Sequence, residues 1–389
     1  MARTDWVPMN DFERQWQDTR EDALRAFTRV GESGWYITAR ELAEFERALA
    51  ALWTLRHCAG VASGLDAIEV ALKALGCRPG DRVLTTPLSA FATTLAIAKL
   101  GAIPVFVDTD AFGLLDLDRC GQLLSQRPEI RFLVPVHLYG NALDLAKLAR
   151  LKERFELTVV EDCAQSILAG YLGTAHKDPG VGHQAQAAMT GTVGQCAATS
   201  FYPTKNLGAM GDGGAILTDD PEVDGRVRAL RDYGQSARYR HDLVGYNSRL
   251  DELQAALLHH AYLGRLAGWT ARRREIAARY LAGIAHLRIR LIGTPAGSHS
   301  CFHLFPVTVE PERKPAFLEH LRQNGVGSGE HYPVAIPDQK AMAQIPHEVA
   351  DNCANARRFA AGEVSLPIHA YMQDDEVARV IAACNGWGA

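Results

Sequence analysis

The stretch CAGVASGLDAIEVALKALGCRPGDRVLTTPLSAFATTLAIAKLGAIPVFVD, residues 58–108, decides the fold class of this chain. Short apolar runs alternate in it with amphipathic segments, and the alternation continues along the chain. The runs of strand length are 58–62, 82–86, 103–108, 132–136, 158–162, 197–201 and 214–218. Helical spacing marks 65–75, 90–100, 145–155 and 221–233. This alternation predicts an α/β fold with a mostly parallel central sheet flanked by helices.

The length of 389 residues is more than one hydrophobic core usually spans, so the sequence predicts two domains. Apolar residues at helical spacing predict helices over 11–27 and 38–53, the second with Thr38 as its N-cap. We assign residues 1–260 to these helices and a large domain that carries the sheet. Residues 261–389 then hold a long helix and a smaller carboxy-terminal α+β domain.

The composition is that of an ordinary globular protein and excludes several kinds of partner. Hydrophobic residues make up 47% of the chain and charged residues 22%. A formal net charge of -4 gives no electrostatic reason to expect nucleic acid or a membrane surface as a partner. The polar amino terminus lacks the apolar stretch of a secretory signal, so we expect a cytoplasmic protein. The eight cysteines form no CxxC pair, which favours buried thiols and predicts no metal site.

The most informative stretch is SFYPTKNLGAMGDGGAILT, residues 200–218. It places Lys205 in a turn after an expected strand, among glycines whose missing side chains let a bound group approach the backbone. A lone lysine in a loop is usually a solvated charge. A partly desolvated lysine can instead form a Schiff base with a carbonyl group, and the glycines around Lys205 favour that role.

Two further stretches stand where an expected strand ends and a helix begins, which is where sites of parallel sheets lie. In VVEDCAQS, residues 159–166, Asp162 either caps the next helix or pairs with a cationic ring nitrogen. Gln165, one turn later, can supply an amide hydrogen bond. In ASGLDAIEVAL, Gly64 opens a helix whose free amides suit a phosphate group, although Ser-Gly before a helix is also an ordinary cap.

A fourth stretch, YGQSARYRHDLVGYNSRLDELQAALL at residues 233–258, precedes an apolar helix expected to begin near Leu250. Asn247 and Ser248 stand just before that helix, where a capping role is the simplest interpretation. The segment is nonetheless dense in polar and aromatic donors, namely Tyr239, His241, Tyr246, Asn247 and Arg249.

Taken in this order, the stretches resemble the DegT/DnrJ/EryC1/StrS family of sugar aminotransferases, which depend on pyridoxal 5'-phosphate (PLP). The resemblance runs from about residue 33 to the carboxy terminus and rests on ASGLDAI, PVHLYG, VVEDCAQS, SFYPTKNLGAMGDGGAILT and GYNSRLDELQAA. It implies the fold type I architecture, with a large PLP-binding domain and a small carboxy-terminal domain. It also implies a homodimer whose cofactor sites lie at the subunit interface.

The resemblance further implies roles for individual residues. Lys205 matches the catalytic lysine that forms the Schiff base and moves the proton, and Asp162 matches the partner of the pyridine nitrogen. Gln165 matches the neighbour of the cofactor's 3-hydroxyl group. Phe91, in LSAFATT, matches the aromatic residue that stacks on the ring. The positions that match phosphate contacts are Gly64, Leu65, Ser200 and, from the neighbouring subunit, Asn247.

Two features depart from the family pattern. Leu65 stands where the family usually has threonine, so one hydroxyl contact to the phosphate is missing. The Gly, Ala and His-rich loop at residues 173–194 is longer than the family's usual turn. It could lie over the site, pack on a partner or be mobile. Family members that act as dehydratases carry histidine in place of the lysine, whereas this chain keeps Lys205.

Within the family, FYPTKNLGAMGDGGA, HLYG and RYRHDLVGYNSRLDELQ are most similar to enzymes that aminate C-3 of dTDP-3-keto-6-deoxyhexoses. The resemblance thus implies transfer of an amino group from L-glutamate to such a keto sugar nucleotide, in amino-sugar biosynthesis. His331 and Tyr332, in GEHYPVA, are candidate substrate contacts. The alternatives are amination at C-4, an inosose aminotransferase, and a PLP-dependent dehydratase or lyase. A regulator without enzymatic activity would not need the pair of Asp162 and Lys205.

Overall fold

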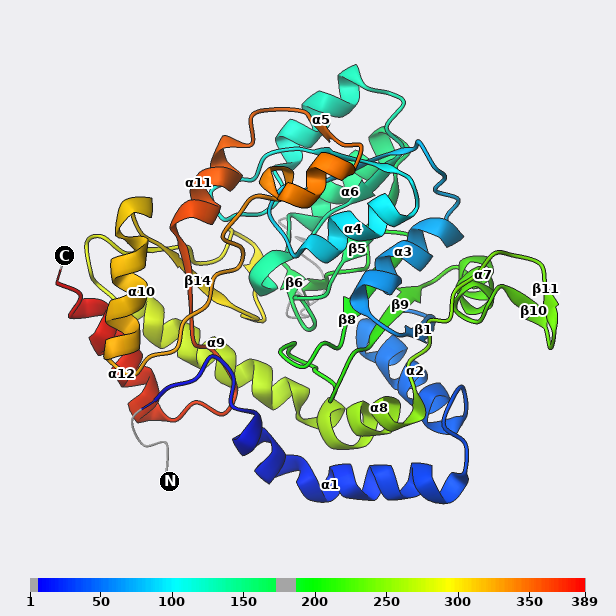
Figure 1. The fold of residues 1–389 in the computed structure, drawn as a ribbon, viewed down its shortest axis with the longest axis horizontal. Coiled ribbons are helices and arrows are strands. Elements are labelled where there is room, and N and C mark those ends of the chain that lie inside the picture. The colour runs from blue at the N-terminus through cyan, green and yellow to red at the C-terminus, as the bar shows by residue number, and fades with distance from the viewer. Residues whose placement is uncertain (1–5, 173–186, 389) are drawn as a thin grey trace, which may run out of the picture.

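The computed structural model describes residues 6–172 and 187–388, and an eight-stranded sheet forms its centre (Figure 1). The strand order is β1-β9-β8-β5-β4-β2-β3-β15. Neighbouring strands are parallel from β8 to β15, while β9 runs antiparallel to both β8 and β1. The bounds are β1 His57–Val61, β2 Arg82–Thr85, β3 Ile103–Phe106, β4 Phe132–Val134, β5 Thr158–Asp162, β8 Cys196–Ser200, β9 Gly214–Thr218 and β15 Glu348–Val349. The mostly parallel sheet and the strands predicted between residues 58 and 218 are confirmed.

Helices cover both faces of this sheet. Successive strand residues point to opposite faces, so Val83 belongs to a core that includes α3, α4 and α7, whereas Leu84 belongs to a core that includes α5 and α6. The helices before the second core are α1 Phe12–Ser33, α2 Arg40–Trp53, α3 Gly64–Ala74, α4 Phe91–Lys99, α5 Leu117–Gln126, α6 Leu145–Arg154 and α7 Pro221–Arg231. Helix α5, which Asp116 caps, was missed by the sequence pattern.

The predicted cap of α2 is wrong. Thr38 has a left-handed φ of 52° and Ala39 holds the N-cap position without a side-chain hydrogen bond. The carboxylate of Glu252 takes over the role, because it accepts hydrogen bonds from the amides of Ala39 at 2.7 Å and Glu41 at 2.8 Å. A residue far along the chain therefore satisfies the free amides of this helix.

The helix expected near Leu250 begins at Glu252, and its N-cap is Asp251 rather than Asn247 or Ser248. Helix α8 (Glu252–Leu257) continues through a π-helical turn and a 3-10 turn into the long helix α9 (Leu266–Gly283). The two turns span Leu258–Tyr262 and Leu263–Arg265. Helix α8 lies beside α1, and α9 leads from there toward α12 (Figure 1).

A second hydrophobic core gathers α9 and the carboxy-terminal elements. They comprise a sheet of order β12-β14-β16 (Arg290–Leu291, Phe305–Thr308, Glu363–Leu366), α10 Lys314–Gln323 and α12 Asp374–Asn385. Val7, from the amino end, packs into the same core. In the other direction, Phe359 of α11 (Ala354–Gly362) packs into the core of the large sheet. Each of the two parts therefore contributes a segment to the core of the other, and the domain boundary at residue 260 stays a prediction.

Part of the long loop at 173–194 can be placed. Residues 173–186 lie outside the described residues, but β7 (Ala188–Met189) pairs with β6 (Gly170–Tyr171), which also pairs with β13 (Ser298–His299). The buried carboxylate of Glu161 then accepts hydrogen bonds from the amides of Gly191 at 2.9 Å and Gly194 at 2.6 Å. The loop's carboxyl end is therefore tied to β5.

The remaining short strands form a hairpin of β10 (Gln235–Ala237) and β11 (Arg240–His241), which projects from the end of the molecule near α7 (Figure 1). Among the described helices, none combines the length and apolar character that a membrane span requires. All eight cysteines are buried and free, as their apolar surroundings in the sequence indicated.

Candidate functional site

A cavity of about 570 Å³ opens at the carboxyl ends of β1, β5 and β8. The predicted site residues that line it are Gly64, Leu65, Asp162, Ser200, Lys205, His331 and Tyr332. They come from segments far apart in the sequence and meet because parallel strands deliver their carboxyl ends to one edge of the sheet. Figure 1 shows this edge facing the carboxy-terminal elements.

One end of the cavity is the amino terminus of α3. The Oγ of Ser63 accepts a hydrogen bond from the amide of Asp66 at 3.1 Å, which leaves the amides of Gly64 and Leu65 without a partner among the described residues. A Cβ at Gly64 would lie 2.5 Å from Cβ of Ser200, so only glycine lets α3 approach β8 this closely. Free amides and the positive end of the helix dipole suit a phosphate group.

Asp162 is buried at the end of β5 and is held by two donors. Its carboxylate accepts hydrogen bonds from the hydroxyl of Thr93 at 2.8 Å and from the amide of Ala164 at 3.1 Å. Burial raises the pKa of Asp162, and these donors and the nearby Lys205 act in the opposite direction. A cationic group in the cavity would therefore find a fixed carboxylate as its partner.

Lys205 is half-buried in the turn that follows β8. Its amide donates to the carbonyl of Tyr202 at 2.8 Å, and the turn closes so tightly that a Cβ at Gly208 would lie 2.2 Å from the carbonyl oxygen of Pro203. Burial lowers the pKa of Lys205 to about 8, although the carboxylate of Asp162 opposes the shift. About a tenth of this amine is therefore neutral, and so nucleophilic, at pH 7, far more than for an ordinary lysine.

Gln165 does not line the cavity itself but is hydrogen-bonded to Tyr332, which lines the cavity together with His331. The side-chain carbonyl of Gln165 accepts from the amide of Tyr139 at 2.7 Å, and its NH2 group donates to the hydroxyl of Tyr332 at 3.2 Å. The Nδ1 of His331 lies 3.0 Å from Oγ of Ser365. Burial and the nearby Lys205 lower the pKa of His331 to about 4, so its ring is neutral near pH 7.

Besides Gln165, two predicted residues do not line the cavity. Phe91 begins α4 but packs against the core of the large sheet, and it is Ala90 and Thr93 beside it that face the cavity. Asn247 is exposed, and its side-chain carbonyl accepts a hydrogen bond from Arg249. Within one chain, neither residue belongs to the cavity wall.

His303 lines the cavity and was missed by the sequence pattern. Its Nδ1 lies 3.1 Å from Oδ1 of Asn206, the residue that follows Lys205. Burial, and secondarily Lys205, lower the pKa of His303 well below its ordinary value. In the sequence the residue stands inside CFHLFPVTV, where apolar neighbours predict a strand and give no sign of a cavity.

The geometry suits a cofactor that carries both an aldehyde and a phosphate, together with a ring nitrogen that can be protonated. PLP has these groups, so the fold and the cavity define a PLP-dependent enzyme of fold type I. The chain belongs to the DegT/DnrJ/EryC1/StrS aminotransferase family, whose model matches residues 17–385.

Individual relatives agree with this assignment over nearly the whole chain. The chain is 38% identical to a dTDP-3-amino-3,4,6-trideoxy-alpha-D-glucose transaminase of Streptomyces venezuelae, over 99% of this chain and 97% of that protein. It is 33% identical to a UDP-N-acetyl-3-dehydro-alpha-D-glucosamine 3-aminotransferase of Acidithiobacillus ferrooxidans, over 98% and 97%. The crystal structure of S. venezuelae DesV in complex with a ketimine intermediate superposes with a TM-score of 0.90 at 37% identity, covering 99% of each chain.

Proposed function

We propose that this aminotransferase moves an amino group from L-glutamate to C-3 of a keto sugar nucleotide, a dTDP-3-keto-6-deoxyhexose. The observation that carries the proposal is the cavity in which half-buried Lys205 and buried Asp162 both lie beside the amino terminus of α3. The names of both relatives place the amino group at position 3 of the sugar, one on a dTDP sugar and one on a UDP sugar. The similarity to the dTDP enzyme is the higher of the two.

Three parts of the cavity would hold PLP. The amides of Gly64 and Leu65 would bind the phosphate, Asp162 would bind the protonated ring nitrogen, and Lys205 would meet the aldehyde. When bound, PLP supplies an electron sink that makes a proton on the neighbouring substrate carbon removable. The neutral amine of Lys205 is the group in the cavity that would accept this proton and return it.

Two serines could compensate for the missing threonine at position 65. Ser200 accepts a hydrogen bond from the amide of Tyr202 at 3.2 Å, and Ser63 accepts one from Asp66. Each hydroxyl therefore keeps its own hydrogen free to donate, and both side chains line the cavity. We expect these hydroxyls and the backbone amides to share the phosphate.

A homodimer with composite sites would explain the exposed apolar surface. Trp35 is 69% exposed, Tyr239 80% and Val244 83%, which is unusual for large apolar side chains. Asn247 stands in the same exposed segment as Tyr239 and Val244. We propose that this segment reaches the phosphate end of the partner's cavity. The eight free thiols fit a reducing, cytoplasmic compartment.

The test is a panel of keto sugar nucleotides offered with L-glutamate and followed by mass spectrometry. The panel holds dTDP-3-keto, dTDP-4-keto and UDP-3-keto sugars and an inosose, with Lys205→Ala as the control. We expect an amine product from the dTDP-3-keto sugar, and conversion of bound PLP to pyridoxamine phosphate by glutamate alone. Preferred amination of another substrate would overturn the substrate assignment, and a dehydrated product without amination would indicate the lyase alternative.

A further inference from the structure

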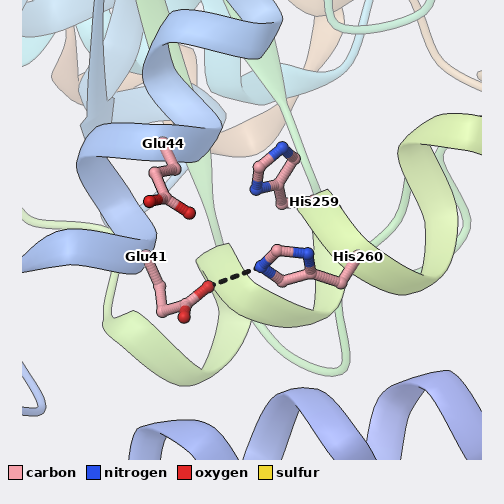
Figure 2. A group of neighbouring side chains, drawn as sticks. All are labelled: Glu41, Glu44, His259 and His260. Atoms are coloured by element: carbon pink, nitrogen blue, oxygen red, sulfur yellow. Dashed lines mark hydrogen bonds and ion pairs between the residues drawn. The ribbon is translucent and has the colours of Figure 1, made fainter. Parts of the chain in front are cut away.

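Four potential metal ligands face one another on two neighbouring helical segments, and none of them lines the cavity. Glu41 and Glu44 project from α2, and His259 and His260 project from the π-helical turn that follows α8 (Figure 2). One donor atom from each side chain lies within 4.8 Å of the donor atoms of the other three. No spacing in the sequence indicates this group, because its two halves come from distant segments.

The local backbone explains how the four side chains converge. Glu41 and Glu44 are three residues apart and so share one face of α2. Consecutive residues of an α-helix point in different directions, but the wider π-helical turn sets the rings of His259 and His260 side by side, with centroids 4.3 Å apart. Such π-helical turns are frequent at functional sites.

The donors are only partly satisfied by protein partners. Nε2 of His260 lies 2.6 Å from Oε2 of Glu41, whereas Nδ1 of His259 is buried and has no hydrogen-bond partner among the described residues. Figure 2 shows a ring nitrogen of His259 turned toward the carboxylate of Glu44.

Positive charges also touch the cluster and limit its affinity. The guanidinium of Arg29, on α1, lies 3.6 Å from Oε1 of Glu41, and that of Arg40 lies 2.7 Å from Oε1 of Glu44. Each arginine faces one oxygen of its carboxylate. Such contacts orient a ligating carboxylate from outside the metal's coordination sphere.

We propose that Glu41, Glu44, His259 and His260 form a zinc site that fastens α2 to the helical segment after α8. Two imidazoles and two carboxylates suit tetrahedral Zn²⁺, whereas Mg²⁺ and Ca²⁺ prefer ligands that are all oxygen. Zinc-ligand bonds of about 2.0–2.2 Å require donors about 3.3 Å apart, so small side-chain rotations close the site. The side chains of Glu44 and His260 are 24% and 26% exposed, which leaves a path for entry.

The proposed zinc would reinforce a connection that the fold already makes. Glu252 at the start of α8 caps α2, and Gln254 on the same helix holds Met210 through hydrogen bonds of 2.9 and 3.1 Å to its amide and carbonyl. Met210 belongs to the glycine-rich loop that follows Lys205. Zinc would thus steady the helix on which this loop rests.

The experiment is a titration of the PLP-loaded enzyme, stripped with EDTA and dialysed, with zinc chloride in a calorimeter. We expect one strong zinc site per chain, a higher melting temperature with zinc, and no comparable binding of magnesium chloride. His259→Gln and Glu44→Gln should each weaken zinc binding at least about tenfold. His320→Gln, which alters a histidine outside the cluster, should bind zinc as the wild type does.

Two results would overturn the site. One is a wild-type enzyme that shows no zinc binding stronger than that of the combined His259→Gln and Glu44→Gln variant. The other is unchanged affinity in both single variants. Circular dichroism checks that each variant is folded, and if His259→Gln is not, the more exposed Glu44→Gln decides. All eight thiols are buried and free, so they do not compete for zinc in the folded enzyme.

Discussion

The carboxyl edge of the sheet and the segment 232–249 carry equally characteristic sequence motifs but differ in what one chain does with them. At the edge, buried Asp162 and half-buried Lys205 line one cavity. In the segment, Asn247 is exposed, bonds to Arg249, and has exposed apolar neighbours such as Val244. The motifs of the edge meet within one chain, whereas no residue of the segment lines the cavity of the described chain. This difference is what the proposed composite site would produce, in which the segment of one chain serves the cavity of its partner.

Lys205→Ala should have the largest effect, because it removes the only lysine that lines the cavity of the described chain. We expect turnover to fall by about 10²–10⁴-fold or more, because general acid-base catalysis alone usually contributes that much. The melting temperature should stay unchanged, since the amine of Lys205 is not needed for packing. Steady-state kinetics measures the turnover, and mass spectrometry after borohydride treatment shows whether the trapped cofactor adduct is lost. Normal turnover without added amines would show that the edge is not the catalytic centre.

Subunit exchange tests the other side of the comparison. A dimer of one Lys205→Ala chain and one Asn247→Ala chain has one site with both lesions and one with neither, if Asn247 acts across the interface. Random pairing should then restore activity to about a quarter of wild type, provided that Asn247 is worth the ~1.5–3 kcal/mol of a hydrogen bond to a charged group.

The matched control for this exchange pairs Lys205→Ala with Asp162→Asn. Both residues line the same chain's cavity, so each mixed dimer carries one lesion per site and activity should not recover. If exchange is verified and the Asn247 mixture also fails to recover, Asn247 does not serve the partner's site.

Asp162→Asn should weaken the reaction more than it weakens PLP binding. The phosphate contacts at α3 would remain, but the ring nitrogen would lose its charged partner. A charge-assisted hydrogen bond of ~1.5–3 kcal/mol corresponds to a roughly ten- to hundredfold rate loss. Turnover and PLP affinity are measured on the same preparation, and full activity in this variant would contradict the role.

The pKa of Lys205 predicts its reactivity in the cofactor-free enzyme. Acetylation by acetic anhydride requires the neutral amine, so its rate at Lys205 should rise with pH to a midpoint of about 8, as mass spectrometry can follow. Asp162→Asn should lower this midpoint, because the carboxylate favours the charged amine. The unfolded chain holds this proton up to the ordinary pKa of lysine, so Lys205 makes stability rise with pH above 8. A midpoint near that ordinary value would show that the amine is not desolvated.

Leu65→Thr should have the smallest effect and the opposite sign. A hydroxyl at the start of α3 adds one donor for the phosphate, and a hydrogen bond of ~0.5–1.5 kcal/mol would tighten PLP binding by up to about tenfold. Equilibrium dialysis of PLP measures the change, with Leu75→Thr, at the other end of α3, as the control. Unchanged affinity would indicate that the serines already satisfy the phosphate.

Sequence reasoning reached the elements and the central residues of the cavity because both depend on local pattern. The alternation of strands and helices from residue 58 onward is periodic, and each strand that the pattern predicted between 58 and 218 is present, while the two-residue strands β6 and β7 were not predicted. Lys205 and Asp162 follow strands whose carboxyl ends must meet at one edge, so strand order in the sequence was enough to bring them together.

What failed depends on partners that are distant in sequence. The cap of α2 comes from Glu252 rather than Thr38, and His303 reaches the cavity from within an apolar run. Phe91 and Ala90 are adjacent, and only the angle at which α4 meets the sheet decides which of them faces the cavity.

By itself, the sequence determined the fold class, the family and the lysine and carboxylate at the centre of the cavity. Hydrophobic periodicity, glycine placement and strand ends are local properties, and they can be read directly from the sequence. Only the tertiary structure decided which side chains turn toward the cavity, which distant carboxylate caps α2, and that two glutamates meet two histidines. These outcomes depend on packing angles between elements and on long-range hydrogen bonds, which no local pattern contains.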